Sequence, residues 1–299
     1  MRYRKVLITG AGGLLGGYLA RALAPHTAVS GFDVKTPAEP MPFTQGDLTD
    51  TGAVRRAVAG ADAIVHVGAI SNVRLGTPER IMQVNVQGTW NLLAAAEEAG
   101  VRRVVLCSSD SVLGFTVLEG KMIPPARLPV MVDDPLAPTD PYALSKLLGE
   151  GIGKSFADRG MEIVALRPVF ILFPSQEGEV IARARDPQGY RWPAAGGHAP
   201  AGGGPMWHYV DPRDVAEAFR LALLLNDVRF EAFWVSGPNT LAPEPTLERF
   251  ARRAGRAPTV TRPEVYRDSP YAPLYDLEHA RRRLGFAAAH DRRDLLAGI

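Results

Sequence analysis

Tyr142 and Lys146 lie four positions apart and are the first residues whose types and spacing favour chemistry. Residues at i and i+4 share one face of a helix, and Pro141, with Asp140 or Thr139 as the cap, is typical of a helix start. A free tyrosine has a pKa of about 10, so a tyrosine acting as a base at neutral pH needs that pKa lowered by roughly three units. A neighbouring ammonium group lowers it by stabilising the phenolate. The spacing therefore favours an acid or base at Tyr142, although two ordinary helix-surface residues would show the same pattern.

Three serines supply hydroxyl groups directly after a run of β-branched residues at 103–107. Open α/β sheets bind their ligands beyond the carboxyl ends of the strands. A serine at that place hydrogen-bonds a substrate oxygen while a tyrosine takes or returns its proton. We expect Ser109 to have this role, with Ser108 and Ser111 as the alternates. All three serines are expected to bind the substrate.

A glycine-rich segment, Gly10-Ala11-Gly12-Gly13-Leu14-Leu15-Gly16, joins the first strand-like run to the first helix-like run. Gly10 permits a sharp turn, Gly13 lets backbone approach a pyrophosphate, and Gly16 lets the helix pack against the strand. Phosphates bind the unpaired N–H groups at the positive end of a helix. The position straight after a first strand favours a dinucleotide site that includes Leu14 and Leu15. The alternative is a turn followed by a glycine-rich helix start.

Asp33 follows the second strand-like run, about 20 residues after the glycine loop. A carboxylate at this place accepts hydrogen bonds from the adenosine ribose hydroxyls of a dinucleotide, and it repels a 2′-phosphate. Lys35, two residues later, weakens that repulsion. The sequence therefore favours NAD as the cofactor over NADP.

Other short segments fall where such a cofactor needs neighbours. The ammonium of Lys146 is expected to hydrogen-bond the nicotinamide ribose, and the positive nicotinamide ring helps to lower the pKa of Tyr142. His66, on an apolar strand, is predicted to be a core histidine. The further expected contacts are Asp47 and Leu48 at the adenine, Val67, Gly68 and Ala69 beside the cofactor backbone, Asn85 on a long helix holding backbone or water, and Pro168 and Val169 near the carboxamide.

Strand-like and helix-like runs alternate through the first half of the chain, which predicts parallel βαβ units and a doubly wound α/β sheet. The strands are nearly all apolar, as expected for strands that are covered on both faces. The expected strands are 4–8, 28–32, 41–45, 63–67, 103–107 and 162–166, and the expected helices are 13–23, 49–59, 79–99 and 140–159.

The pattern changes after Pro168. Residues 174–205 are rich in Gly, Pro and Arg and are predicted to be irregular. Helices are expected beyond them at 212–225, 246–254 and 276–284, with a strand at 230–235. The predicted division is a dinucleotide-binding domain at 1–170 plus about 208–228, and a small C-terminal substrate-binding lobe at about 171–207 and 229–299.

A series of ordered motifs makes the sequence resemble the extended short-chain dehydrogenase/reductase group, the NAD-dependent epimerase/dehydratase family, over about residues 4–225. The resemblance implies a Rossmann-type fold, an active site at Ser109, Tyr142 and Lys146, and hydride transfer at a secondary alcohol. It also implies a homodimer formed through the helices at 79–99 and 141–159. The motifs are TGAGGLLG, Asp33, Asp47-Leu48, HVGA, NVQGTWN, CSSDSVLG, YALSK, LRP and HYVDPRDVAEAF.

The leading hypothesis is a dehydrogenase that oxidises a small polyol, sugar or sugar acid with NAD. Arg74, Arg191 and His208 lie in segments expected to approach the substrate, and arginine forks bind anionic groups. The alternative is a redox-neutral sugar or nucleotide-sugar epimerase that uses the same three residues. A dehydratase is disfavoured, because the resemblance implies an acid/base pair beside the serine of dehydratases and no glutamate follows Asp110. A cofactor-binding regulator has no evident use for all three groups.

Composition limits the remaining possibilities. The chain has 299 residues, of which 46% are hydrophobic and 22% charged, which is ordinary for a globular protein. A net charge of +2 does not indicate nucleic-acid binding, and the apolar runs are too short for a membrane span. The first residues lack a signal-peptide pattern, and the single cysteine, Cys107, fits a reducing compartment. We therefore expect a cytoplasmic protein that binds neither nucleic acid nor membranes. The resemblance implies a carbohydrate-like substrate, and no metal is expected.

Overall fold

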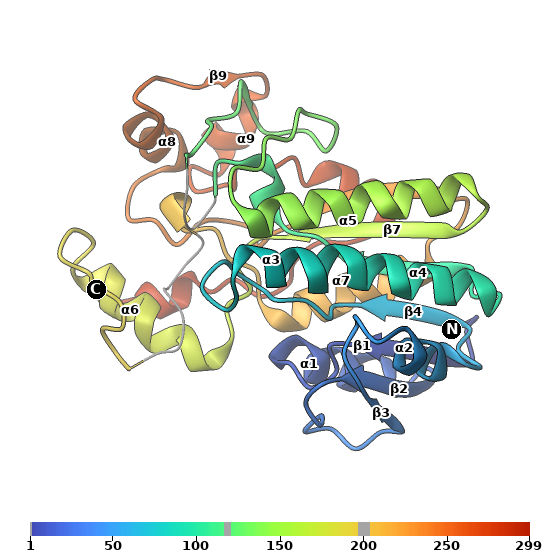
Figure 1. The fold of residues 1–299 in the computed structure, drawn as a ribbon. Coiled ribbons are helices and arrows are strands. Elements are labelled where there is room, and N and C mark those ends of the chain that lie inside the picture. The colour runs from blue at the N-terminus through green and yellow to red at the C-terminus, as the bar shows by residue number, and fades with distance from the viewer. Residues whose placement is uncertain (1, 117–120, 197–203) are drawn as a thin grey trace.

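A seven-stranded parallel sheet forms the centre of the computed structural model, which describes residues 2–116, 121–196 and 204–299 (Figure 1). The strands follow the order β3-β2-β1-β4-β5-β7-β8, so the direction of winding reverses between β1 and β4. Ligands bind at such a reversal, beyond the carboxyl ends of the strands. The strands are β1 (Lys5–Thr9), β2 (Ala28–Asp33), β3 (Phe43–Gln45), β4 (Ala63–His66), β5 (Arg103–Cys107), β7 (Glu162–Pro168) and β8 (Phe230–Val235).

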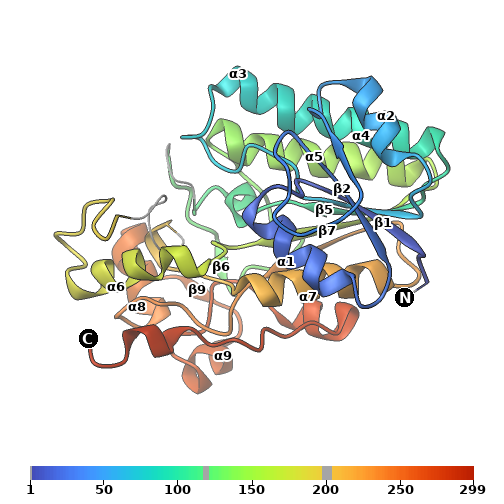
Figure 2. The same ribbon diagram turned by 90° about the horizontal axis from the view of Figure 1, so that it is seen from below.

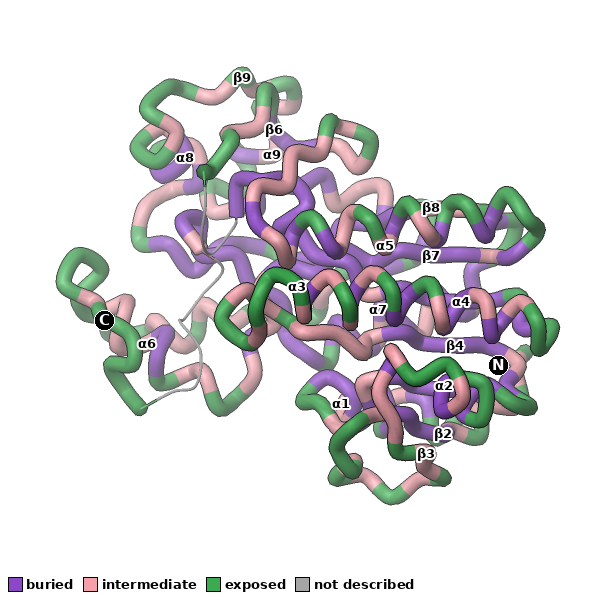
Figure 3. Tube along the Cα trace, viewed as in Figure 1, coloured by how far each residue is buried: buried purple, intermediate pink, exposed green. Residues whose placement is uncertain are grey.

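Helices cover both faces of the sheet (Figure 2). On one face α1 (Leu14–Leu23) packs against α7 (Pro212–Leu224). On the other face α4 (Gly88–Glu98) packs between α2 (Thr51–Val58) and α5 (Pro141–Asp158). The central strands are consequently buried (Figure 3), which confirms the doubly wound α/β sheet predicted from their apolar sequences. In the described part of the chain, no helix has the length and hydropathy to cross a membrane.

One long helical run was expected at 79–99, and the structure shows it with a widened turn in its middle. The run begins as α3 (Pro78–Ile81), continues as a π-helical stretch at Met82–Gln87 and ends as α4. Turns of this kind recur at functional sites in helices. Here the stretch contains Asn85, which faces α5.

A smaller lobe lies beyond the carboxyl ends of the strands (Figure 1). It contains α6 (Glu177–Arg185), α8 (Thr246–Ala254) and α9 (Pro263–Asp268). A two-stranded parallel sheet joins β6 (Arg127–Leu128) to β9 (Thr259–Val260). Part of the lobe has its own apolar core, made of Leu172, Val180, Trp207, Tyr209, Leu241 and Ala242.

The second half of the chain departs from expectation in several elements. β8 was expected in the lobe but pairs with β7 and forms the edge of the main sheet. α6 lies inside 174–205, which was predicted to be irregular. Its acidic first turn and basic last turn suit the helix dipole, a signal that the Gly- and Pro-rich flanks obscure. The helix expected at 276–284 contains a π-helical turn, Ala280–Leu284. Residues 197–203 of the predicted loop lie outside the described residues.

Candidate active site

A cleft of about 920 Å³ runs along the carboxyl ends of β1, β2, β4, β5 and β7. Most residues predicted to bind the cofactor or the substrate line this cleft. They are Gly10, Gly13, Leu14, Leu15, Gly16, Asp33, Asp47, Leu48, Val67, Gly68, Ala69, Ser108, Ser109, Ser111, Tyr142, Lys146, Pro168 and Val169. The tertiary structure therefore brings together segments that lie up to about half the chain apart.

The glycine loop has the backbone shape that phosphate binding requires. Gly10 has φ +75°, and a Cβ there would lie 2.6 Å from the backbone nitrogen of Gly68. A Cβ on Gly16 would lie 2.5 Å from the carbonyl oxygen of Gly10, so glycine is needed at both positions. Gly13 precedes α1, and no side chain caps that helix. The first N–H groups of α1 thus have no side-chain partner and face the place where a pyrophosphate would bind.

Asp33 at the end of β2 braces this loop. Its Oδ2 accepts a hydrogen bond from Gly12 N at 2.9 Å, and its Oδ1 accepts one from Lys35 N at 3.0 Å. Each carboxylate oxygen has a second acceptor position, which ribose hydroxyls could use. The residues present therefore fit an adenosine ribose that carries a free 2′-hydroxyl.

Asp47 meets a partner that the sequence did not indicate. It accepts hydrogen bonds from the backbone and side chain of Thr49 and forms an ion pair with Arg80. Burial works against ionisation, but these hydrogen bonds and the guanidinium hold the pKa of Asp47 below its usual value. Arg80 also lines the cleft, as Leu48 does. The Arg80 contact spans 33 positions of sequence and no local pattern marks it.

The predicted catalytic residues meet at the start of α5. Asp140 caps this helix by accepting a hydrogen bond from Ala143 N at 2.7 Å. Tyr142 and Ser109 line the same cleft, and the Ser109 side chain acts on the pKa of the Tyr142 phenol. Lys146 Nζ donates to the carbonyl oxygen of Cys107 at 2.8 Å and lies 5.7 Å from the centre of the Tyr142 ring. The helix spacing and the end of β5 therefore bring phenol, hydroxyl and ammonium groups together.

Burial governs the protonation of this group. It raises the pKa of Tyr142, the nearby Cys107 and Asp110 raise it further, and the Ser109 hydrogen bond lowers it. Burial lowers the pKa of Lys146. Tyr142 is therefore a phenol at neutral pH.

Ser108 is engaged inside the protein. Its hydroxyl donates a hydrogen bond to Glu150 on α5. Glu150 also receives two hydrogen bonds from the guanidinium of Arg167 on β7, at 2.9 and 2.8 Å, and both side chains are buried. The expectation that the Ser108 hydroxyl binds substrate is therefore not supported, because that hydroxyl helps to join β5, α5 and β7.

Asn85 holds the backbone of Ile70, a residue of the cleft wall. Its Nδ2 donates to the carbonyl oxygen of Ile70 at 3.0 Å and to Ser145 Oγ at 2.9 Å. Its Oδ1 accepts from Ile70 N at 2.8 Å. The expectation that Asn85 holds backbone is thus confirmed. The expected cofactor contact is not supported, because Asn85 is buried and does not line the cleft.

Two histidines are neutral core residues. His66 is buried between the hydroxyls of Thr9 and Thr89, and burial lowers its pKa to about 3, which confirms the predicted core role. His208 was expected at the substrate, and this prediction is wrong. Its side chain is fully buried in the lobe, where Nε2 accepts a hydrogen bond from Leu274 N, and burial lowers its pKa to about 3.

The two arginines expected at the substrate do not line the cleft in the described part of the chain. Arg191 is exposed and donates to the carbonyl oxygens of Gln188 and Tyr190. The guanidinium of Arg74 lies 6.0 Å from the ring centre of Trp192. This arrangement supports neither residue as a substrate ligand.

Further residues of the cleft wall were not singled out from the sequence. Several follow the ends of β4 and β7, so the rule that ligands bind at the carboxyl ends of strands could have identified them. Others come from the turn after Ser109 and from the lobe, and no local signal marks them. The set includes Ser71, Asn72, Thr116, Phe170, Ser175 and Gln176.

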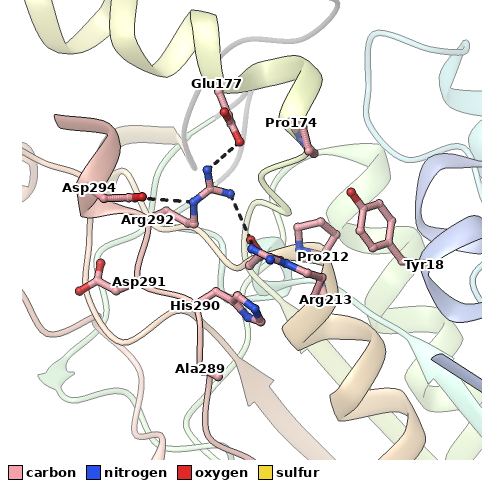
Figure 4. Close-up of a pocket in the computed structure, with 11 residues that line it drawn as sticks. Tyr18, Pro174, Glu177, Pro212, Arg213, Ala289, His290, Asp291, Arg292 and Asp294 are labelled. Atoms are coloured by element: carbon pink, nitrogen blue, oxygen red, sulfur yellow. Dashed lines mark hydrogen bonds and ion pairs between the residues drawn. The ribbon is translucent and has the colours of Figure 1, made fainter. Parts of the chain in front are cut away.

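A second cavity, of about 570 Å³, lies where the C-terminal segment meets α1, α6 and α7 (Figure 4). Its charged side chains pair with one another. Arg292 lies 2.6 Å from Glu177 and 3.1 Å from Asp211, and Arg213 lies 2.8 Å from Asp211. These pairs dock the C-terminal segment on the start of α7, so we assign this cavity to packing.

Comparisons with known proteins identify the family of this chain. A family model described as the NAD dependent epimerase/dehydratase family matches residues 6–233. A uronate dehydrogenase of Pseudomonas syringae pv. tomato is 33% identical over 173 residues, which cover 55% of this chain and 58% of that protein. An L-arabinose 1-dehydrogenase (NAD(P)(+)) of Haloferax volcanii is 30% identical over 173 residues, which cover 56% of this chain and 67% of that protein. The match to the uronate dehydrogenase thus spans less than two thirds of its length.

Solved structures share the fold over nearly the whole chain. A short-chain dehydrogenase/reductase superfamily protein from Agrobacterium tumefaciens with bound NAD has a TM-score of 0.70 and 25% identity, covering 98% of this chain and 95% of its own. UDP-glucose 4-epimerase of Thermus thermophilus in complex with NAD has a TM-score of 0.62 and 26% identity, covering 86% of this chain and 85% of its own. Since the family model covers most of the sequence, this chain belongs to the NAD dependent epimerase/dehydratase family.

Proposed function

We propose that this protein is an NAD-dependent dehydrogenase that oxidises a secondary alcohol of a sugar, a sugar acid or a similar polyol. The observation that carries the proposal is the meeting of Tyr142, Ser109 and Lys146 in the same cleft as the glycine loop. The dehydrogenase names of several similar proteins support the same class of reaction.

The cleft residues suit NAD along its length. The N–H groups at the start of α1 would hold the pyrophosphate, Asp33 the adenosine ribose, and Leu48 the adenine. Lys146 would hydrogen-bond the nicotinamide ribose with donors not used by Cys107, because an ammonium has three. When bound, NAD supplies a hydride acceptor and a positive charge near Tyr142.

The chemistry of the chain itself is proton transfer and orientation. The Ser109 hydroxyl hydrogen-bonds the substrate oxygen and holds it against Tyr142. The phenolic oxygen of Tyr142 takes the proton of the substrate hydroxyl as the carbonyl forms. The Lys146 ammonium, 5.7 Å from the Tyr142 ring centre, would favour the phenolate through its charge.

The first experiment separates a dehydrogenase from a redox-neutral epimerase. The purified protein is denatured and the released nicotinamide is assayed. NADH formation is then followed by absorbance while NAD is offered with sugars, sugar acids and polyols. Steady NADH formation is expected. Stoichiometric bound NAD with no net NADH would instead favour the epimerase.

Replacement of the phenol tests the role of Tyr142. Tyr142→Phe should keep NAD affinity and lower kcat by about 10²–10⁴-fold, the usual contribution of general acid–base catalysis. Tyr3→Phe, at a half-buried tyrosine that does not line the cleft, is the matched control and should keep wild-type turnover. Near-normal turnover of Tyr142→Phe would exclude the phenol as the base.

We further propose a homodimer through α4 and α5. These neighbouring helices expose large apolar side chains, with Trp90 at 46%, Leu144 at 39% and Leu148 at 41% of their surfaces accessible. Exposed apolar patches of this kind often mark protein–protein contacts.

A further inference from the structure

A carboxylate that the proposed mechanism does not use lies beside the predicted catalytic serine. Asp110 follows Ser109, opens the 3₁₀ turn Asp110–Leu113 and lines the cleft. It is only 7% exposed, and its Oδ1 lies 3.5 Å from the Ser109 hydroxyl. A buried carboxylate is costly unless it is hydrogen-bonded, so its partners bear on its role.

The lobe fixes one oxygen of this carboxylate. Tyr275, 165 positions away in sequence, donates a hydrogen bond to Asp110 Oδ2 at 2.8 Å. The buried Tyr275 ring packs against Trp234, with ring centres 4.6 Å apart, and against the neutral His208, at 5.1 Å. The direction of the carboxylate is therefore set by packing, and Oδ1 is the oxygen left beside Ser109.

Further hydroxyl groups line the cleft near Asp110. Ser111 Oγ lies 2.9 Å from Ser109 Oγ, and Thr116 also lines the cleft. Burial raises the pKa of Asp110 to about 6, while the hydrogen bonds from Tyr275 and Ser109 lower it. The carboxylate is thus mostly ionised above pH 7. This part of the cleft presents a fixed negative charge among neutral hydroxyls.

The two cationic side chains of the described cleft wall have other roles. Lys146 donates to the Cys107 carbonyl and is proposed to hold the nicotinamide ribose, and Arg80 pairs with Asp47. A substrate carboxylate or phosphate would therefore meet the negative charge of Asp110 with no compensating arginine fork among the described lining residues.

We propose that Asp110 binds substrate hydroxyls and selects an uncharged polyhydroxy substrate, an aldose or a polyol, against sugar acids and sugar phosphates. The inference rests on the proposed dehydrogenase function and narrows its substrate class. A carboxylate accepts hydrogen bonds from neighbouring sugar hydroxyls and repels a second anion. This class differs from the one in the name of the uronate dehydrogenases to which the chain is similar.

Matched pairs of free sugars test the selection. NADH formation is measured with galactose against galacturonate and with glucose against glucuronate. The wild type should show kcat/KM about 100-fold or more in favour of the neutral sugar of at least one pair. The same sugars are titrated by calorimetry into the enzyme with NADH, so that binding is measured apart from turnover.

Two variants locate the selection at Asp110. Asp110→Asn should lower kcat/KM for the neutral sugar by about tenfold and raise it for the acid, because the amide does not repel an anion. Tyr275→Phe keeps the charge of Asp110 but removes the hydrogen bond that fixes the direction of its carboxylate. It should therefore reduce the ratio of kcat/KM for the neutral sugar to kcat/KM for the acid. Asp268→Asn, at an exposed carboxylate, is the matched control and should keep the wild-type ratio. If Asp110→Asn does not fold, Tyr275→Phe decides.

The outcomes separate this inference from the proposed function. Equal or faster turnover of the acid by the wild type, or an unchanged preference in the folded variants, would overturn the selection and leave the dehydrogenase standing. Absence of NADH formation with every sugar would count against the dehydrogenase, and calorimetry would then decide the selection. Tighter binding of the neutral sugar would support the selection by Asp110. Equal or tighter binding of the acid, or binding of neither sugar, would overturn that selection.

Discussion

At the level of single residues, the Asp33 carboxylate accepts two hydrogen bonds from the protein, and the cofactor is proposed as a third partner. The carboxylate braces the glycine loop through Gly12 and presents negative charge where a ribose would lie. Asp33→Asn keeps an acceptor for the loop but removes the charge. We expect NADH to bind about tenfold more weakly while NADPH binds no worse, since hydrogen bonds to charged groups contribute about 1.5–3 kcal/mol. Dissociation constants from NADH and NADPH fluorescence check this.

Asp47→Asn is the matched control for that measurement. Asp47 also lines the cleft, but its carboxylate is paired with Arg80. Its replacement should change the affinity for NADH and NADPH by similar factors. Unchanged discrimination in Asp33→Asn would remove Asp33 from the ribose.

Asp110 carries a cost in stability that depends on pH. Its pKa is raised from 3.8 to about 6 in the folded protein, so ionisation disfavours folding. The cost is fully present above pH 6 and disappears as the pH falls to about 4, and it amounts to about 3 kcal/mol for a shift of this size. Asp110→Asn should therefore raise the free energy of unfolding at pH 8 by up to that amount and change it little at pH 4. Urea denaturation at both pH values measures the difference.

A stabilisation that is equal at both pH values, or a loss at pH 8, would contradict a buried ionised carboxylate at this site. The exposed Asp268→Asn variant serves again as the control and should leave the unfolding free energy unchanged within about 0.5 kcal/mol.

At the level of elements, the buried pair between Glu150 and Arg167 ties α5 to β7. The Ser108 hydroxyl joins the same pair, so β5 is held as well. Glu150→Gln leaves the Arg167 charge buried without its partner. Breaking a buried pair in this way costs about 3–5 kcal/mol, which chemical denaturation should detect.

A more accessible pair provides the comparison. Glu217 and Arg220 are partly exposed on α7, and Glu217→Gln should cost no more than about 1 kcal/mol. If Glu150→Gln and Glu217→Gln lower the free energy of unfolding by similar amounts, the buried Glu150 pair does not stabilise the protein more than the more accessible pair does.

At the level of the whole molecule, the apolar surface of α4 and α5 is the proposed dimer contact. A glutamate placed in such a contact is desolvated without a partner. Leu148→Glu should therefore shift the protein from dimer to monomer, as measured by size-exclusion chromatography with light scattering. Ile299→Glu, at another exposed apolar residue, is the control and should leave the mass unchanged. A wild-type monomer at micromolar concentration would exclude the dimer.

Sequence alone was sufficient where a single element or turn carries the signal. Tyr142 and Lys146 share a helix face whatever the rest of the fold does, because four positions make about one helical turn. The glycine loop and Asp33 each follow a strand at a fixed distance, so their positions were predictable. The doubly wound sheet was likewise predictable, because alternating apolar strands and helices leave few other arrangements.

The tertiary structure alone decided which side chains meet across long stretches of sequence. The hydrogen bond between Tyr275 and Asp110, the ion pair between Arg80 and Asp47, and the burial of His208 all depend on how distant elements pack. The sequence of β8 is typical of any short apolar strand. Only its pairing with β7 shows that it belongs to the main sheet. Local periodicity records which face of an element is apolar, but it carries no information about which distant element will cover that face.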